Sequence, residues 1–90
     1  MRAVRFRVSG RVQGVGFRYF TQQEARRLGV SGWVRNRADG TVDGEAQGSL
    51  AAMGTFEQAL RRGPSHGRVE RLDVEPVDSM PESDEFEIRY

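Results

Sequence analysis

The spacing of hydrophobic residues changes several times along the chain, and each spacing predicts a different element. Between residues 3 and 12 apolar and polar residues alternate, which is typical of a strand with one buried face. From Phe17 to Leu28 the apolar residues recur every three or four positions, and Gly29 follows, as at the end of an amphipathic helix. The helical spacing returns over residues 50–62, where Ser49 can cap the first turn. These patterns predict one strand and two helices.

The remaining segments favour strands. Residues 31–37 and 41–47 predict the two strands of a hairpin, because the Asp-Gly pair between them is a strong turn signal. Residues 67–76 predict a further strand, in which Val69 is out of phase and indicates a bulge. Alternating apolar residues at positions 86–90 predict a short last strand.

The order β-α-β-β-α-β, followed by the short C-terminal strand, is that of the ferredoxin-like, split βαβ α+β fold. This fold has an antiparallel sheet with two helices on one face. No repeat or linker interrupts residues 1–90, so we expect a single domain. The first helix is a crossover, so the first two strands run parallel and end at the same edge of the sheet. The Gly-rich loop after residue 12 should therefore lie beside Arg35 and Asn36, whereas the placement of the last strand stays open.

Composition excludes several classes of protein. The 90 residues contain no Cys and one His, which excludes a disulfide framework, a thiolate zinc site, a thiol nucleophile and any site that needs two His. No apolar run approaches the roughly 18 residues of a membrane span. The N-terminus alternates Arg with apolar residues and lacks the apolar stretch of a signal peptide. We therefore expect a cytoplasmic protein without a membrane partner.

The charge is distributed unevenly along the chain. Residues 1–37 contain nine Arg and one acid, whereas residues 38–90 contain five Arg and twelve acids. All fourteen basic residues are Arg, whose planar fork matches phosphate oxygens in pairs. A solvated basic face and a site for an anion both fit this distribution, and coding bias also explains the absence of Lys.

The segment from Gly10 to Arg18 leads from a predicted strand into a predicted helix. Gly14 and Gly16 allow the backbone to curve around a ligand, and the free amides of a helix N-terminus favour an anion. Arg18 opposes the helix dipole there, so its position is unusual for stability alone. The glycine spacing fits neither a Walker motif nor a dinucleotide fingerprint. Spacing alone leaves a phosphate cradle and a plain tight turn equally open.

Asn36 closes the first strand of the predicted hairpin. Its amide could hold a water or a phosphoryl oxygen, although spacing alone slightly favours a turn residue. We expect His66 to be an exposed loop residue, Trp33 a packing residue and Asp39 a turn residue rather than a metal ligand. A solvated edge is expected for the acidic residues near the C-terminus, which are Glu82, Asp84, Glu85 and Glu87.

Two motifs resemble signatures of the acylphosphatase family. The segment Gly10–Arg18 is similar to the first, G-x-V-x-G-V-x-F-R, at every fixed position. The segment Gly32–Asn36 resembles the second, and Gly40, Val42 and Gly48 follow it at the expected spacing. The similarity extends over essentially the whole chain, including the last five residues, and is loose only between residues 64 and 84.

The resemblance implies a metal-independent enzyme that hydrolyses acyl phosphates to a carboxylate and inorganic phosphate without any cofactor. By the same resemblance, Arg18 binds the phosphate and Asn36 orients the attacking water. The loop backbone implied to bind the phosphoryl oxygens comprises Gln13, Gly14, Val15, Gly16, Phe17 and Arg18.

Three functions other than hydrolysis of acyl phosphates remain as alternatives. An RNA-binding domain of the same fold would need paired aromatic residues on a central strand, which the sequence lacks, and the acidic second half opposes it. The second alternative is a catalytically silent acylphosphatase-like fold that binds an anion. The third is a carbamoyl-phosphate-handling module like those embedded in larger proteins. We expect a free-standing monomeric enzyme without a nucleic-acid partner; the sequence does not name its physiological acyl phosphate.

Overall fold

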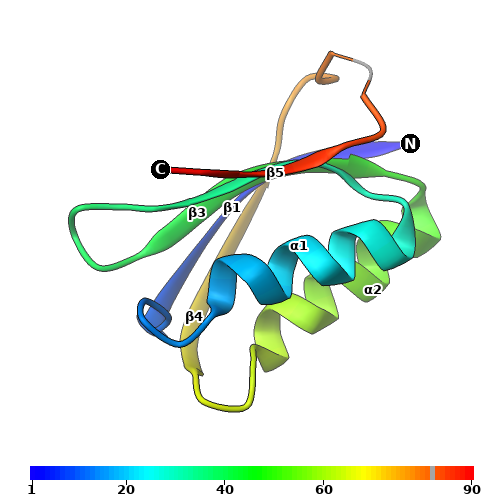
Figure 1. Ribbon diagram of the computed structural model, residues 1–90. Helices are drawn as coiled ribbons and strands as arrows, with labels where there is room; N and C mark the ends of the chain where they lie inside the picture. Colours follow the sequence, from blue (N-terminus) through cyan, green and yellow to red (C-terminus); the bar gives the residue numbers. More distant parts are fainter. Residues whose placement is uncertain (82) are drawn as a thin grey trace.

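In the computed structural model, two helices lie side by side against one face of a five-stranded sheet (Figure 1). The structure describes residues 1–81 and 83–90. In chain order the elements are β1 (Arg2–Arg11), α1 (Phe17–Leu28), β2 (Ser31–Asn36), β3 (Val42–Gly48), α2 (Leu50–Arg62), β4 (Arg68–Pro76) and β5 (Phe86–Arg89). The predicted α+β, ferredoxin-like fold is confirmed, and both helices have the predicted bounds.

The strands lie in the order β4-β1-β3-β2-β5. Both β1 and β2 pair antiparallel with β3, so they run parallel to each other and end at one edge of the sheet. The last strand, whose placement the sequence left open, pairs with β2 in parallel, with Gly32 opposite Phe86 and Val34 opposite Ile88. The sheet is thus antiparallel over its first four strands and becomes mixed at β5.

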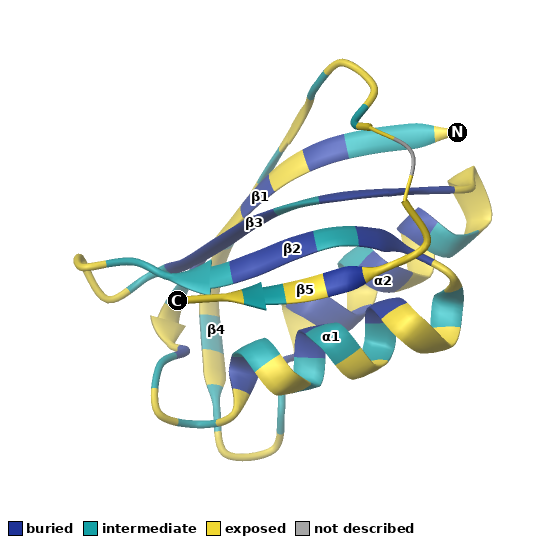
Figure 2. Ribbon diagram, turned by 45° about the horizontal axis from the view of Figure 1, so that its top comes forward, coloured by how far each residue is buried: buried dark blue, intermediate teal, exposed yellow. Residues whose placement is uncertain are grey.

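The core fills the layer between the sheet and the two helices (Figure 2). Phe56 of α2 packs edge-on against Phe6 of β1, with 5.9 Å between the ring centroids, and also against Phe86 at 5.9 Å. Phe6 lies over Gly44 of β3, where an added Cβ would be 2.6 Å from Cζ of the ring. The glycine therefore leaves room for an aromatic ring whose burial contributes about 1.5–3 kcal/mol.

A bulge in β4 shapes the end of β1 that leads into the loop of interest. Ser9 lies opposite Arg71 and Gly10 lies opposite Val69, so Glu70 is the additional residue. This confirms the irregularity predicted from the phase of Val69. Gly10 has φ of 122°, and a Cβ there would approach the carbonyl oxygen of Arg68 at 2.3 Å, so the close approach of β1 to β4 requires glycine.

The helix termini follow their sequence signals. Ser49 accepts a hydrogen bond from the backbone N–H of Ala52 at 3.1 Å and caps α2. At the end of α1, Gly29 is left-handed with φ of 73°. Within the described part of the chain, neither helix is both long and apolar enough to cross a membrane.

Candidate active site

The loop after β1 and the end of β2 meet at one edge of the sheet, as the topology predicts. They border a hollow of about 280 Å³. It is lined by Val12, Gly14, Gly16, Phe17, Arg18, Tyr19, Asn36, Ile88 and Tyr90. The fold therefore brings Arg18 and Asn36 together with both loop glycines, although the two segments are separated by the whole of α1.

The start of α1 has the features of an anion site. Gly16 precedes the helix in a left-handed conformation with φ of 77°, and Gly14 has φ of 74°. An added Cβ would meet nothing within 4 Å at either glycine, so it is the backbone conformation that requires them. Among the described residues, no side chain caps α1 and no acidic residue lies in its first turn. The positive end of this helix is therefore not neutralised by the protein.

Arg18 lies in the first turn of α1 and is partly buried. Its guanidinium Cζ is 4.8 Å from the centroid of the Tyr90 ring, within the range of a cation–π contact. In residues 1–81 and 83–90, the side-chain ion pairs are made by other arginines, and Arg18 has no carboxylate partner. A cation–π contact leaves the N–H groups of a guanidinium without a hydrogen-bonded acceptor, so they stay available for an anion.

Asn36 is the last residue of β2 and lies opposite Val42 of β3. Because side chains alternate along a strand, Asn36 shares the helix-side face with the buried Val34, whereas Arg35 lies on the opposite face. The partly buried Asn36 amide borders the hollow from the side of the sheet.

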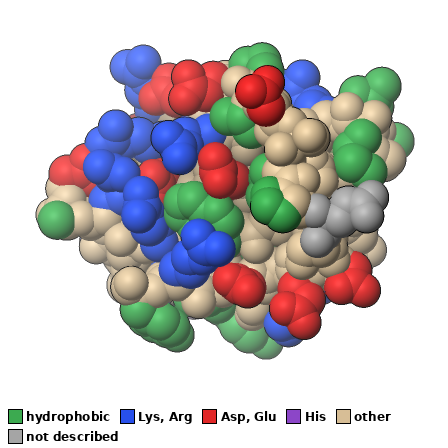
Figure 3. Space-filling model, turned by 90° about the horizontal axis from the view of Figure 1, so that it is seen from above, with side chains coloured by type: hydrophobic (Ala, Val, Ile, Leu, Met, Phe, Trp, Pro, Cys, Tyr) green, Lys and Arg blue, Asp and Glu red, His purple; other side chains and the backbone are tan. Residues whose placement is uncertain are grey.

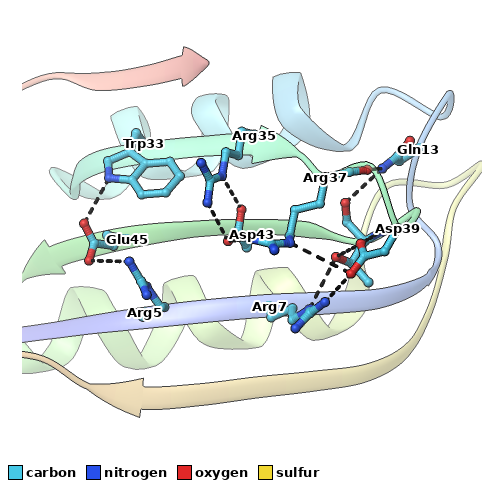
Figure 4. A network of polar contacts seen from close by, with 10 residues as sticks. Arg5, Arg7, Gln13, Trp33, Arg35, Arg37, Asp39, Asp43 and Glu45 are labelled. Carbon is cyan, nitrogen blue, oxygen red and sulfur yellow. Dashed lines mark hydrogen bonds and ion pairs between the residues drawn. The ribbon is translucent and has the colours of Figure 1, made fainter. Parts of the chain in front are cut away.

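The side chain of Gln13 links the two halves of the site. Its amide nitrogen donates to the carbonyl oxygens of Arg37 at 2.7 Å and Thr41 at 2.9 Å (Figure 4). The side chain thus bonds to the hairpin between β2 and β3, and Gln13 is not among the residues lining the hollow. Val15 does not line it either, because it packs against the hydrophobic core. The binding role expected of the backbone at these two residues stays a prediction.

Two carboxylates hold the hairpin beside Asn36. Hydrogen bonds from the hydroxyl and N–H of Thr41, together with the nearby charge of Arg7, lower the pKa of Asp39 to about 2. Asp39 is therefore a turn residue, as predicted. Burial alone would raise the pKa of Asp43, but hydrogen bonds from Arg35 and Arg37 outweigh this effect and lower it. Both carboxylates are charged at neutral pH.

Four residues that line the hollow are not predicted by the sequence patterns: Tyr90, Ile88, Tyr19 and Val12. Ile88 and Tyr90 arrive on or just after β5, so a signal for them would have required knowing that β5 lies beside β2. His66 is exposed and Trp33 is packed, as predicted. The C-terminal acids Asp84, Glu85 and Glu87 are exposed, whereas Glu82 lies outside the described residues.

Comparison with known proteins identifies the family. The family model for acylphosphatase matches residues 4–88. The chain belongs to the acylphosphatase family. An acylphosphatase of Salinibacter ruber is 48% identical over 83 residues, which are 92% of this chain and 87% of the relative. One from Geobacillus thermodenitrificans is 44% identical over 90 residues, covering 100% of this chain and 96% of the relative.

Solved structures agree with the sequence relatives. This chain superposes on the crystal structure of an acylphosphatase from Bacillus subtilis with a TM-score of 0.95 and 41% sequence identity. The superposition covers 100% of each chain. The predicted membership of the acylphosphatase family is thus confirmed, and the protein is an enzyme that hydrolyses acyl phosphates.

Proposed function

We propose that the hollow binds the phosphoryl group of an acyl phosphate and that Asn36 aligns the water that attacks it. One observation carries this proposal: an arginine without a carboxylate partner among the described residues and an uncapped helix start border the same hollow as the Asn36 amide. Arg18 and the backbone amides of residues 13–18 are assigned to the phosphoryl oxygens. The arginine fork and the helix N-terminus both match a phosphate group.

Charge stabilisation accounts for most of the proposed catalysis. Phosphoryl transfer has a loose transition state in which charge is spread over three equatorial oxygens. Donors fixed before the reaction stabilise that charge without reorganisation. Gly14 and Gly16 adopt left-handed conformations that shape the loop, and the guanidinium of Arg18 contacts the exposed Tyr90 ring, so both sets of donors already lie at the hollow before substrate binds.

The water step requires alignment rather than a strong base. The amide oxygen of Asn36 accepts a hydrogen bond from the water, and its NH₂ group can donate to a phosphoryl oxygen. The water oxygen then forms a bond to phosphorus as the bond from phosphorus to the carboxyl oxygen breaks. The carboxylate leaves with the bonding electron pair, and the proton of the water passes to a phosphoryl oxygen. A carboxylate is a good leaving group, so this step needs no strong general acid.

The same scheme assigns no step to a metal ion or an organic cofactor. We propose in addition that the enzyme is a cytoplasmic monomer; the absence of cysteine suits a reducing compartment. Light scattering after gel filtration measures the molar mass in solution. The mass of a dimer at micromolar concentration would contradict the proposed monomer.

Hydrolysis of benzoyl phosphate in EDTA tests the proposal. The wild type should turn over in the presence of chelator, with inorganic phosphate as a competitive inhibitor. Arg18→Ala should nearly abolish turnover and, in a direct titration with phosphate, phosphate binding, because a bidentate charged partner is lost. Arg26→Ala removes an exposed arginine in the last turn of the same helix and should behave as the wild type. An Arg18→Ala enzyme that keeps wild-type turnover would overturn the proposal, and so would loss of activity in EDTA that added metal restores.

A further inference from the structure

The face of the sheet turned away from the helices carries charges that alternate across the strands. Arg5 of β1 lies opposite Glu45 of β3 on one side and Glu75 of β4 on the other. Figure 3, which looks onto this face, shows arginines and carboxylates interspersed. Asp43 is the most buried of the paired carboxylates, with 7% of its side chain exposed, and it lies in the strand beside Asn36.

Asp43 binds the two residues that flank Asn36 in the sequence. Its Oδ1 accepts from Nε of Arg35 at 2.8 Å, and its Oδ2 accepts from Nη1 of Arg37 at 3.0 Å (Figure 4). Strand alternation places Arg35 and Arg37 on the open face and Asn36 on the face of the hollow. One carboxylate therefore binds the side chains on both sides of Asn36, from the face of the sheet opposite the hollow.

We infer that Asp43 is a positioning residue for Asn36, which it orients by binding Arg35 and Arg37. This inference rests on the function proposed above. Without Asp43, the two like charges on either side of Asn36 would repel each other at the point where β2 ends. The backbone at Arg37 would then depend on its hydrogen bonds with Thr41, Gly40 and the side chain of Gln13.

Asp43→Asn tests this inference because it removes the charge and keeps the size of the side chain. The kcat should fall on the order of tenfold, because a displacement of about 1 Å can cost about a hundredfold and the hydrogen bonds that remain at Arg37 limit the displacement. The inhibition constant for inorganic phosphate should not rise, because Arg18 and the loop are untouched and the site becomes more positive. Glu45→Gln is the matched control. It makes the same charge change on the same face of β3, where Glu45 binds Arg5 and Trp33, and should leave kcat unchanged.

A double-mutant cycle separates positioning from a merely structural role. If Asp43 acts through Asn36, then Asp43→Asn should cause no further loss of kcat in an Asn36→Ala enzyme. A tenfold loss that persists in the Asn36→Ala background would overturn the inference. Arg37→Gln breaks the contact between Arg37 and Asp43 from its more exposed end, and it replaces Asp43→Asn if that variant does not fold. It too should lower kcat in the wild-type background and cause no further loss in the Asn36→Ala background.

Different results would contradict the proposed function and the inference about Asp43. An Asn36→Ala enzyme with wild-type kcat would contradict the proposed function. A large loss in Asn36→Ala, combined with wild-type kcat in both Asp43→Asn and Arg37→Gln, would leave that function intact and overturn the inference about Asp43.

Discussion

The ring of Tyr90 lies against the guanidinium of Arg18, with 4.8 Å between Cζ and the ring centroid. The pair joins the C-terminal residue to the first turn of α1. Among the described residues no carboxylate pairs with Arg18, so its N–H groups stay free to bind a phosphoryl group.

Removal of the Tyr90 ring should weaken phosphate binding. An exposed cation–π contact contributes about 0.5–1 kcal/mol, so Tyr90→Ala should raise the inhibition constant for phosphate about two- to fivefold. Tyr90→Phe keeps the ring and should stay near the wild type. Competitive inhibition by phosphate measures both variants. An equal loss in Tyr90→Phe would show that the hydroxyl, rather than the ring, is responsible.

The Gln13 side chain should couple the phosphate loop to the hairpin that carries Asn36. Gln13→Ala removes two hydrogen bonds to carbonyl oxygens, and the free energy of unfolding should fall by about 1–3 kcal/mol. The kcat should fall as well, because the loop and Asn36 lose their link. Urea unfolding and steady-state kinetics measure the two effects. Gln23→Ala, at an exposed position on α1, is the control, and equal stability of the two variants would contradict this prediction.

Replacement by alanine should change the free energy of unfolding in opposite directions at Gly16 and Gly54. An added Cβ meets nothing within 4 Å at either position, so only the backbone conformation distinguishes them. Gly16 is left-handed, and Gly16→Ala should destabilise the fold by about 1–2 kcal/mol. Gly54 is an exposed residue inside α2, and Gly54→Ala should stabilise it by about 0.5–1 kcal/mol. Chemical denaturation gives both signs, and equal changes would be inconsistent with the left-handed conformation.

The sequence predicts elements whose signals are local and misses features that depend on tertiary packing. Both helices carry their own terminal signals, so their bounds were predictable. The four residues of β5 form a short edge strand. Its place beside β2 depends on tertiary contacts, such as that of Phe86 with Phe56 of α2. The position of Tyr90 could therefore not be foreseen.

The burial of Asp43 illustrates the same limit. Side chains alternate along β3, so Asp43 lies on the face away from the helices, where an acid is expected to be solvated. Two long arginine side chains from the neighbouring strand and turn cover it instead, because arginine packs its stem over a surface while its charge stays in water. Such cover depends on which strand lies next to which, and no single segment encodes it.

Acid should weaken the hairpin through Asp39. Its pKa is about 2 in the folded protein, below the ordinary value of 3.8, so the carboxylate contributes its full stability above about pH 4. That contribution is lost as the pH falls through the folded pKa. Asp39→Asn removes this titration, so the difference in unfolding free energy between wild type and variant should shrink from pH 5 to pH 2. Urea unfolding across this range measures it, and a constant difference would contradict the assignment.

The division of work between Arg18 and Asn36 is tested most directly by measuring kcat and the phosphate inhibition constant of Asn36→Ala. We predict that kcat falls on the order of 10²–10³-fold, the scale of one lost transition-state donor, while the inhibition constant rises much less. Arg18→Ala, measured beside it, should lose turnover and, in a direct titration, phosphate binding. An Asn36→Ala enzyme whose phosphate affinity falls as far as its kcat would show that Asn36 binds phosphate and does not align the water.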